Sequence, residues 1–283
     1  MIAITGASGQ LGRLVIAALL DSQPADQIIA VVRNPDSVAD LAAQGVQVRR
    51  ADYSDQPALE AAFQGADKLL LISSSEVGQR AAQHRNVIAA AKAAGVGLLA
   101  YTSLLHADRS ALLLAEEHRT TEAELAASGL PYVLLRNGWY TENYLAGLPA
   151  ALEHGALIGA AGQGRIASAT RADYAAAAAA VLTRPDQAGK TYELSGDSAY
   201  TLADFAAELS RQTGRQIPYV NMTQADYAAA LAGAGIPQGF AEVLAQSDAA
   251  AADGGLFGDS GDLATLIGRP TTPLAEAMAA ALR

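Results

Sequence analysis

Three glycines near the start of the chain are the residues whose spacing first indicates chemistry. Gly6, Gly9 and Gly12 stand three apart in "AITGASGQLGRLVIAALL", residues 3–20, between a short apolar run and an amphipathic one. This spacing allows a sharp turn, close approach to a pyrophosphate, and tight packing of a helix on the preceding strand. The helix then directs free N–H groups at the phosphates. The stretch predicts a dinucleotide-binding loop, and the alternative is a tight turn without a ligand. The predicted loop comprises Gly6, Ala7, Ser8, Gly9, Gln10, Leu11 and Gly12.

The residue at the end of the second expected strand selects between two dinucleotides. An NAD site places Asp or Glu there, about 20 residues past the glycines, to bind the ribose 2′-hydroxyl. Here the sequence reads "VVRNP", so the residue is Arg33. A guanidinium cannot accept that hydroxyl's hydrogen, but its charge and geometry match a 2′-phosphate. Arg33 therefore favours NADP(H) over NAD(H), unless it is only a solvated residue at a strand end. Asp52, which closes the third strand, is expected at the adenine edge, unless it caps a turn.

The elements that must position these residues alternate along the first half of the chain. Short apolar runs predict strands, and i, i+3, i+4 spacing of apolar residues predicts helices between them. Such alternation predicts a parallel, doubly wound sheet with right-handed crossovers. The expected strands are 2–5, 27–33, 46–52, 68–75, 96–105 and 130–138, and the expected helices are 11–19, 38–45, 56–65, 79–95 and 115–128.

The rhythm breaks after about residue 140. An alanine-rich helix over 172–183, a strand over 190–196 and a helix over 201–214 are expected, followed by a glycine-rich loop over 250–262. The predicted fold class is α/β, a Rossmann-type doubly wound parallel sheet with a smaller C-terminal α/β substrate subdomain. The first domain is expected over residues 1–150. The second is expected over residues 151–283, with parts threading back into the main sheet.

Composition excludes several classes of function. There are 19 Lys and Arg against 29 Asp and Glu, a net charge of −10, which argues against nucleic-acid and anionic-membrane partners. The chain has no cysteine, so thiol nucleophiles and iron–sulfur clusters are excluded, and its four scattered histidines predict no metal site. No apolar run approaches the roughly 20 residues of a membrane span, and the N-terminus lacks a signal peptide's basic segment. We expect a soluble cytoplasmic protein, and nothing in the sequence indicates an oligomeric state.

Several motifs together resemble a known family. "TGASGQLG", "LLLISSS", "YTSLLHA", "PYVLLRNGWYTENY" and "ASATRADYA" resemble the atypical short-chain dehydrogenases of the NmrA-like group, and the resemblance runs from end to end. It implies a cofactor site in which strand-end serines meet the phosphate and ribose, a second group lies at the nicotinamide end, and a third closes over the cofactor. These groups are, in that order, Ser73, Ser74 and Ser75; Asn137, Gly138, Trp139, Tyr140, Thr141 and Glu142; and Ala169, Thr170, Arg171, Ala172, Asp173 and Tyr174.

A catalytic pair is missing. Typical short-chain dehydrogenases use Tyr-x-x-x-Lys to protonate a carbonyl oxygen, and no tyrosine here is followed four residues on by lysine. The helix expected at 115–128 offers His118 and Glu122 instead, which we interpret as a helix-surface pair rather than as a proton donor. Reduction of a ketone leaves an alkoxide that requires an acid, whereas a quinone yields a hydroquinone anion, a much weaker base. Proximity and orientation of the nicotinamide and the quinone ring can therefore supply most of the rate acceleration without a positioned acid. The sequence therefore favours direct hydride transfer from NADPH to a small planar quinone, without flavin.

One residue is the best candidate for contact with the acceptor. The Asn143 carboxamide can donate a hydrogen bond to a quinone carbonyl and stabilise the charge that develops there. Ser103, near the position of the superfamily's catalytic serine, is a weaker candidate. The aromatic residues of "NGWYTENY" suit a flat ring and favour an enzyme. The alternative is an NmrA-type redox sensor that binds NADP(H) without turnover, and an epimerase or carbonyl reductase is disfavoured by the missing pair.

Overall fold

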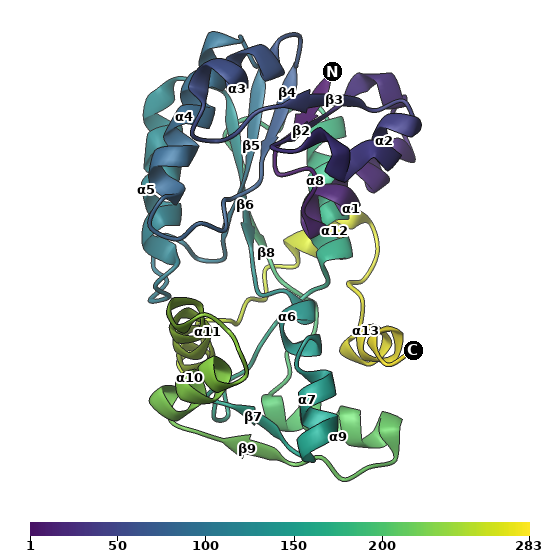
Figure 1. The fold of residues 1–283 in the computed structure, drawn as a ribbon, viewed down its shortest axis with the longest axis vertical. Coiled ribbons are helices and arrows are strands. Elements are labelled where there is room, and N and C mark those ends of the chain that lie inside the picture. Colours follow the sequence, from purple (N-terminus) through teal and green to yellow (C-terminus); the bar gives the residue numbers. More distant parts are fainter.

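A seven-stranded parallel sheet forms one half of the molecule, and the computed structural model describes residues 1–283 (Figure 1). Its order is β3-β2-β1-β4-β5-β6-β8, so the direction of winding reverses between β1 and β4. In open parallel sheets, ligands bind outside the carboxyl ends of the strands at this reversal. The strands are β1 (Ile2–Ile4), β2 (Ile28–Val32), β3 (Gln47–Arg50), β4 (Lys68–Leu71), β5 (Leu98–Leu104), β6 (Tyr132–Asn137) and β8 (Thr191–Leu194).

Helices cover both faces of this sheet. One face carries α1, α2, α8 and α12, and the other carries α3, α4 and α5. Two single-turn 3₁₀ helices, η1 (Ala25–Gln27) and η2 (Pro35–Val38), flank β2. The covering helices are α1 (Gln10–Leu20), α2 (Ala39–Ala43), α3 (Gln56–Phe63), α4 (Arg80–Ala93), α5 (Ala115–Ser128), α8 (Arg171–Thr183) and α12 (Asp262–Ile267).

The strands divide the core into two layers. Ile2 and Ile4 face the cluster built with α1 and α8, while Ala3 between them faces the cluster built with α3 and α4. Successive side chains of a strand point to opposite faces, so a strand buried on both faces is apolar throughout. Four alanines of α8 are buried against α1 and the sheet, namely Ala175, Ala177, Ala178 and Ala179. The alanine-rich stretch is thus a packing surface that permits close contact between helices.

A second lobe lies beyond the carboxyl edge of the sheet (Figure 1). Its core includes Trp139, Leu148, Phe205 and Leu209, and its two short strands pair in parallel. The boundary predicted at residue 150 falls inside α7, which packs in this lobe. No helix is both long and apolar enough to cross a bilayer. The elements are α6 (Thr141–Leu145), α7 (Leu148–His154), β7 (Leu157–Gly159), α9 (Leu202–Thr213), β9 (Tyr219–Asn221), α10 (Gln224–Gly233), α11 (Gln238–Ala251) and α13 (Leu274–Ala281).

The predicted fold class is confirmed, with differences at the strand ends. The strand expected over 68–75 ends at Leu71, because the chain then leaves the sheet to form a loop at its carboxyl edge. β7 and β9 have three residues each and were not expected, since runs that short carry no periodicity. β8, α8 and α12 return from the second half of the chain to the main sheet.

Asp173, in the first turn of α8, ties the C-terminal segment to the sheet. Its carboxylate is fully buried and accepts hydrogen bonds from the Thr170 hydroxyl at 2.8 Å and the Thr272 N–H at 2.9 Å. Arg269 adds an ion pair at 2.8 Å. The family resemblance implies that Asp173 belongs to the segment that closes over the cofactor, whereas in the structure its carboxylate accepts from these donors. Its role here is to fix the segment that leads into α13.

Replacing Asp173 by alanine is expected to lower the free energy of unfolding by about 3 kcal/mol, because buried donors and one guanidinium lose their partner. Urea titration followed by circular dichroism measures this change. Asp253→Ala, at an exposed aspartate, is the matched control and should leave stability within about 0.5 kcal/mol. Equal stability of the two variants would contradict the anchoring role.

Candidate functional site

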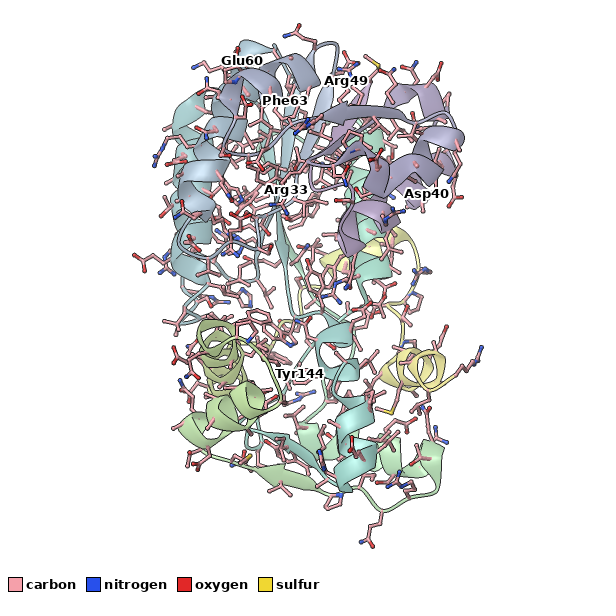
Figure 2. The ribbon with its side chains drawn as sticks, viewed as in Figure 1. Arg33, Asp40, Arg49, Glu60, Phe63 and Tyr144 are labelled. Atoms are coloured by element: carbon pink, nitrogen blue, oxygen red, sulfur yellow. The ribbon has the colours of Figure 1, made fainter.

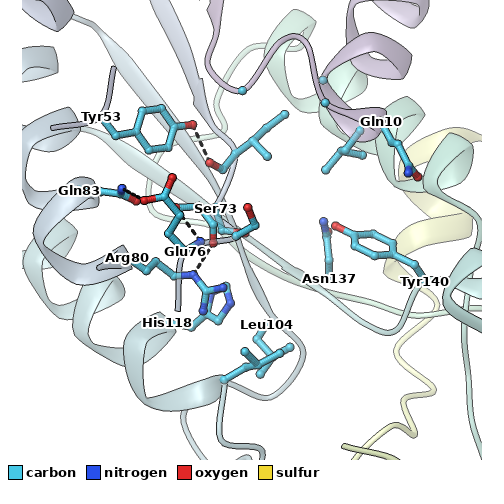
Figure 3. A pocket seen from close by; sticks show the side chains of 18 of the residues that line it. Gln10, Tyr53, Ser73, Glu76, Arg80, Gln83, Leu104, His118, Asn137 and Tyr140 are labelled. Atoms are coloured by element: carbon cyan, nitrogen blue, oxygen red, sulfur yellow. Dashed lines mark hydrogen bonds between the residues drawn. The ribbon is translucent and has the colours of Figure 1, made fainter. Parts of the chain in front are cut away.

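A cavity of about 670 Å³ opens at the carboxyl edge of the sheet (Figure 3). Its wall is built from the β1–α1 loop, the ends of β2, β5 and β6, the loops after β3 and β4, and one face of α11. The sheet and the helices α4 and α5 that cover it supply most of the wall, and the second lobe supplies the rest. This is the place where the strand order reverses, as expected for a ligand site in such a sheet.

The glycine loop has the geometry of a phosphate cradle. Gly6 lies in the left-handed region, with φ of 59°, and its carbonyl accepts from the Gly9 N–H at 3.0 Å. A Cβ atom on Gly12 would lie 2.4 Å from the Gly6 carbonyl oxygen and 2.8 Å from the Ala7 Cα, so only glycine fits. α1 begins without a capping side chain or an acidic residue in its first turn. Its free N–H groups and its dipole are available to an anion.

The end of β2 carries the predicted phosphate ligand. Arg33 lines the cavity with a largely exposed guanidinium, whose Nη1 lies 3.1 Å from Glu76 Oε1. Figure 2 shows Arg33 in the upper lobe, which contains the sheet. Asp52 also lines the cavity, and hydrogen bonds from Ser54 lower the pKa of its carboxyl. β3 ends at Arg50, two residues before Asp52. Arg33 has no other ion-pair partner within the protein.

Polar groups from behind the wall hold the loop after β4. Ser73 N–H donates to the Thr102 hydroxyl at 2.9 Å, and Ser74 N–H donates to His84 Nε2 at 2.9 Å. Burial lowers the pKa of His84 to about 3, so this imidazole stays neutral and able to accept. Arg80 Nε donates to the Ser74 carbonyl at 2.7 Å. Ser73, Ser74 and Ser75 thus lie in the cavity wall, as predicted.

The other end of the cavity is formed by the segment after β6. The Arg171 guanidinium lies over the Tyr140 ring at 4.4 Å, and its Nη2 donates to Asn143 Oδ1 at 2.9 Å. Two buried polar atoms of the wall, Asn137 Oδ1 and Trp139 Nε1, have no partner within the protein. Buried polar atoms are almost always paired, so this wall fits a ligand that carries both donors and acceptors.

Some predicted residues stand behind the wall rather than in it. The Tyr174 hydroxyl donates to the Trp139 carbonyl at 3.3 Å, and Glu142 accepts from the Arg171 N–H at 2.9 Å. These residues support the cavity wall through such contacts. The predicted site residues outside the cavity lining are Ala7, Thr141, Glu142, Ala169, Thr170, Ala172, Asp173 and Tyr174.

The interpretation of His118 and Glu122 as a helix-surface pair is wrong. His118 is 5% exposed, lines the cavity and hydrogen-bonds to the Tyr101 hydroxyl. Glu122 accepts from the Ser103 hydroxyl and pairs with Arg136 at 2.7 Å. The helix α5 is polar nearly all round, so its sequence pattern does not show which stripe faces inward.

The sequence also missed the contribution of the second lobe. Phe240, Val243 and Leu244 of α11 line the cavity, more than 200 residues after the glycine loop. No local pattern reports a contact between segments so distant in the chain. Arg80 and Gln83, at the start of α4, also line the cavity and were not predicted.

Comparison with known proteins identifies the family. A family model of NAD(P)H-binding domains matches residues 6–185. The chain belongs to this NAD(P)H-binding family. It is 64% identical to quinone oxidoreductase 2 of Escherichia coli, over 98% of this chain and 97% of that protein. The predicted nicotinamide cofactor and the resemblance seen in the motifs are thereby confirmed.

Solved structures agree over the full length. The chain matches E. coli NADPH-dependent quinone oxidoreductase in complex with NADPH, with a TM-score of 0.98 and 63% identity over 100% of each chain. It also matches a Citrobacter triphenylmethane reductase in complex with NADP(H), with a TM-score of 0.96 and 41% identity over 99% of this chain and 100% of that one. All elements of both lobes therefore have counterparts in solved structures.

Arg33→Ala is expected to weaken NADPH binding about 10- to 50-fold and to leave NADH binding within about 2-fold, because only NADPH carries the 2′-phosphate. Titration by fluorescence or calorimetry measures both dissociation constants. Arg85→Ala, which removes an exposed arginine paired with Glu124, is the control. An equal loss for both cofactors would show that Arg33 does not bind the 2′-phosphate.

Proposed function

We propose that this chain is an NADPH-dependent reductase that transfers a hydride directly to a quinone, without flavin. The observation that carries the proposal is the cavity, which extends from the glycine loop past the end of β6 to α11. It therefore has room for an acceptor beside a nicotinamide ring. The E. coli relative named quinone oxidoreductase 2, similar over the full length, supports the same activity.

The residues present fit a bound NADPH. When bound, the reduced nicotinamide supplies the hydride. The first turn of α1 would hold the pyrophosphate, and Arg33 would hold the 2′-phosphate in exchange for Glu76. Asn137 and Trp139, with their unpaired polar atoms, would orient the nicotinamide end. The apolar side chains of α11 would exclude water from the acceptor.

Asn143 is held as a hydrogen-bond donor. Its Oδ1 accepts from Arg171, whose guanidinium is itself fixed over the Tyr140 ring. The amide nitrogen therefore remains free to donate to a carbonyl oxygen of the acceptor. A donor placed where negative charge develops stabilises the transition state more than the ground state. The hydroquinone anion then takes its proton from solvent.

The proposal also covers the location of the protein and its partners. NADPH is a cytoplasmic reductant, so we place the protein in the cytoplasm. The net charge of −10 disfavours nucleic-acid partners. A small planar quinone is the partner that the cavity supports.

The decisive experiment follows NADPH absorbance in the presence and absence of a simple benzoquinone. We expect quinone-dependent oxidation well above the uncatalysed rate and no bound flavin in the purified protein. Tight NADPH binding without turnover would refute the reductase and favour the redox sensor. The same assay with NADH gives the cofactor preference.

Asn143→Ala is expected to lower kcat for quinone reduction about 10- to 100-fold, while the dissociation constant for NADPH stays within about 2-fold. The physical reason is the loss of one donor to the developing oxyanion. Steady-state kinetics and an NADPH titration measure the two quantities. Asn221→Ala, in β9 of the second lobe, is the control, and an unchanged kcat for Asn143→Ala would remove the assignment.

A further inference from the structure

A buried histidine opens onto the same cavity from α5. His118 lines the wall together with Ser103 and Leu104, which end β5 (Figure 3). Leu104 is paired in register with Asn137 of β6. Since neighbouring strands lie less than about 5 Å apart, the side of the cavity that holds His118 adjoins the end where the nicotinamide is expected.

A buried tyrosine fixes the tautomer of this imidazole. The Tyr101 hydroxyl lies 2.7 Å from His118 Nδ1, and the other polar side chain beside the phenol is Thr121. Thr121 Oγ1 donates to the Glu117 carbonyl at 3.0 Å and lies 2.9 Å from His84 Nδ1, so His118 Nδ1 is the acceptor at hydrogen-bond distance for the fully buried phenol. The phenol therefore donates to Nδ1, and the ring hydrogen sits on Nε2. Nε2 has no partner within the protein and is left to the cavity.

The surroundings keep the imidazole neutral. Burial lowers the pKa of His118 well below its ordinary value, and the positive charge of Arg80 lowers it further. Arg80 is itself buried and pairs with Glu117 at 3.2 Å, and His84 is the other titratable ring nearby. A neutral imidazole whose Nε2 carries hydrogen is a donor of hydrogen bonds rather than of protons.

We propose that His118 is a second catalytic residue, which donates a hydrogen bond from Nε2 to the acceptor oxygen that gains charge, with Tyr101 as its positioning residue. This inference rests on the proposed quinone reduction. The hydride brings two electrons and one hydrogen to the acceptor and leaves the cofactor oxidised. The acceptor oxygen becomes an anion, to which His118 donates from α5 and Asn143 from α6. A proton from solvent then completes the hydroquinone, so neither His118 nor Tyr101 changes its protonation state.

The test compares His118→Leu with His118→Gln. The leucine variant should lose about 10- to 100-fold in kcat and keep its NADPH affinity, because a donor to the oxyanion is removed while the cofactor contacts remain. Glutamine can place an N–H group near the position of Nε2 and should stay within about 5-fold of the wild type. His154→Leu, at an exposed histidine in α7, is the control. A leucine variant with the wild-type kcat would overturn the proposal.

A double variant separates catalysis from folding. Tyr101→Phe with His118→Leu removes both partners of the buried pair, so that neither polar group is left unsatisfied. We expect a folded protein that binds NADPH as the wild type does and still shows the low kcat. Recovery of the wild-type kcat in the double variant would mean that His118 serves only to satisfy Tyr101. Failure of the proposed function itself is recognised separately, by the absence of quinone-dependent turnover in the wild-type protein.

Discussion

The close approach of α1 to the loop before it is the constraint on which the cavity depends. With no side chain on Gly12, the first turn of the helix lies directly against the Gly6 carbonyl. That contact sets where β1 ends and where the helix N–H groups point. A second contact of the same kind lies behind Trp139, where a Cβ atom on Gly196 would meet the Ser168 carbonyl at 2.1 Å. It holds the chain after β8 against the segment that supports Trp139. The glycine loop and the segment behind Trp139 are thus both fixed by backbone that touches backbone.

Buried polar side chains hold the loop after β4, where the regular hydrogen bonds of the sheet end. β4 ends at Leu71, and the next backbone groups bond to side chains: Ile72 N–H to the Thr5 hydroxyl, and Ser74 N–H to His84. The Tyr53 hydroxyl donates to the Ile72 carbonyl at 2.8 Å. Because each buried donor and acceptor needs a partner, this network holds the loop almost as firmly as a strand would. Ligand contacts therefore come from a rigid loop.

How much of this could be predicted from the sequence follows from the range of each interaction. The alternation of strands and helices, the glycine loop and Arg33 are local patterns, so the parallel, doubly wound sheet and the phosphate end were predictable. The contribution of Phe240 and the inward orientation of His118 depend on contacts across the whole chain. The sequence pattern of α5 could not reveal the inward orientation of His118, because this helix is polar on almost every side. Likewise, the buried carboxylate of Asp173 resembles an ordinary first-turn acid until its partners near residue 270 are in place.

The pair formed by Arg33 and Glu76 has a consequence for nucleotide exchange. Glu76 also accepts from the Gln83 amide at 2.8 Å, so its carboxylate is held beside the guanidinium by a neutral neighbour. It acts as a resident counter-ion. An incoming phosphate replaces one anion by another, so the guanidinium is never stripped of a partner, and exposed ion pairs of this kind are weak enough to be exchanged readily. Salt weakens the resident pair with Glu76 as well as the pair with the phosphate, so part of its effect on phosphate binding is offset by weaker competition from the carboxylate.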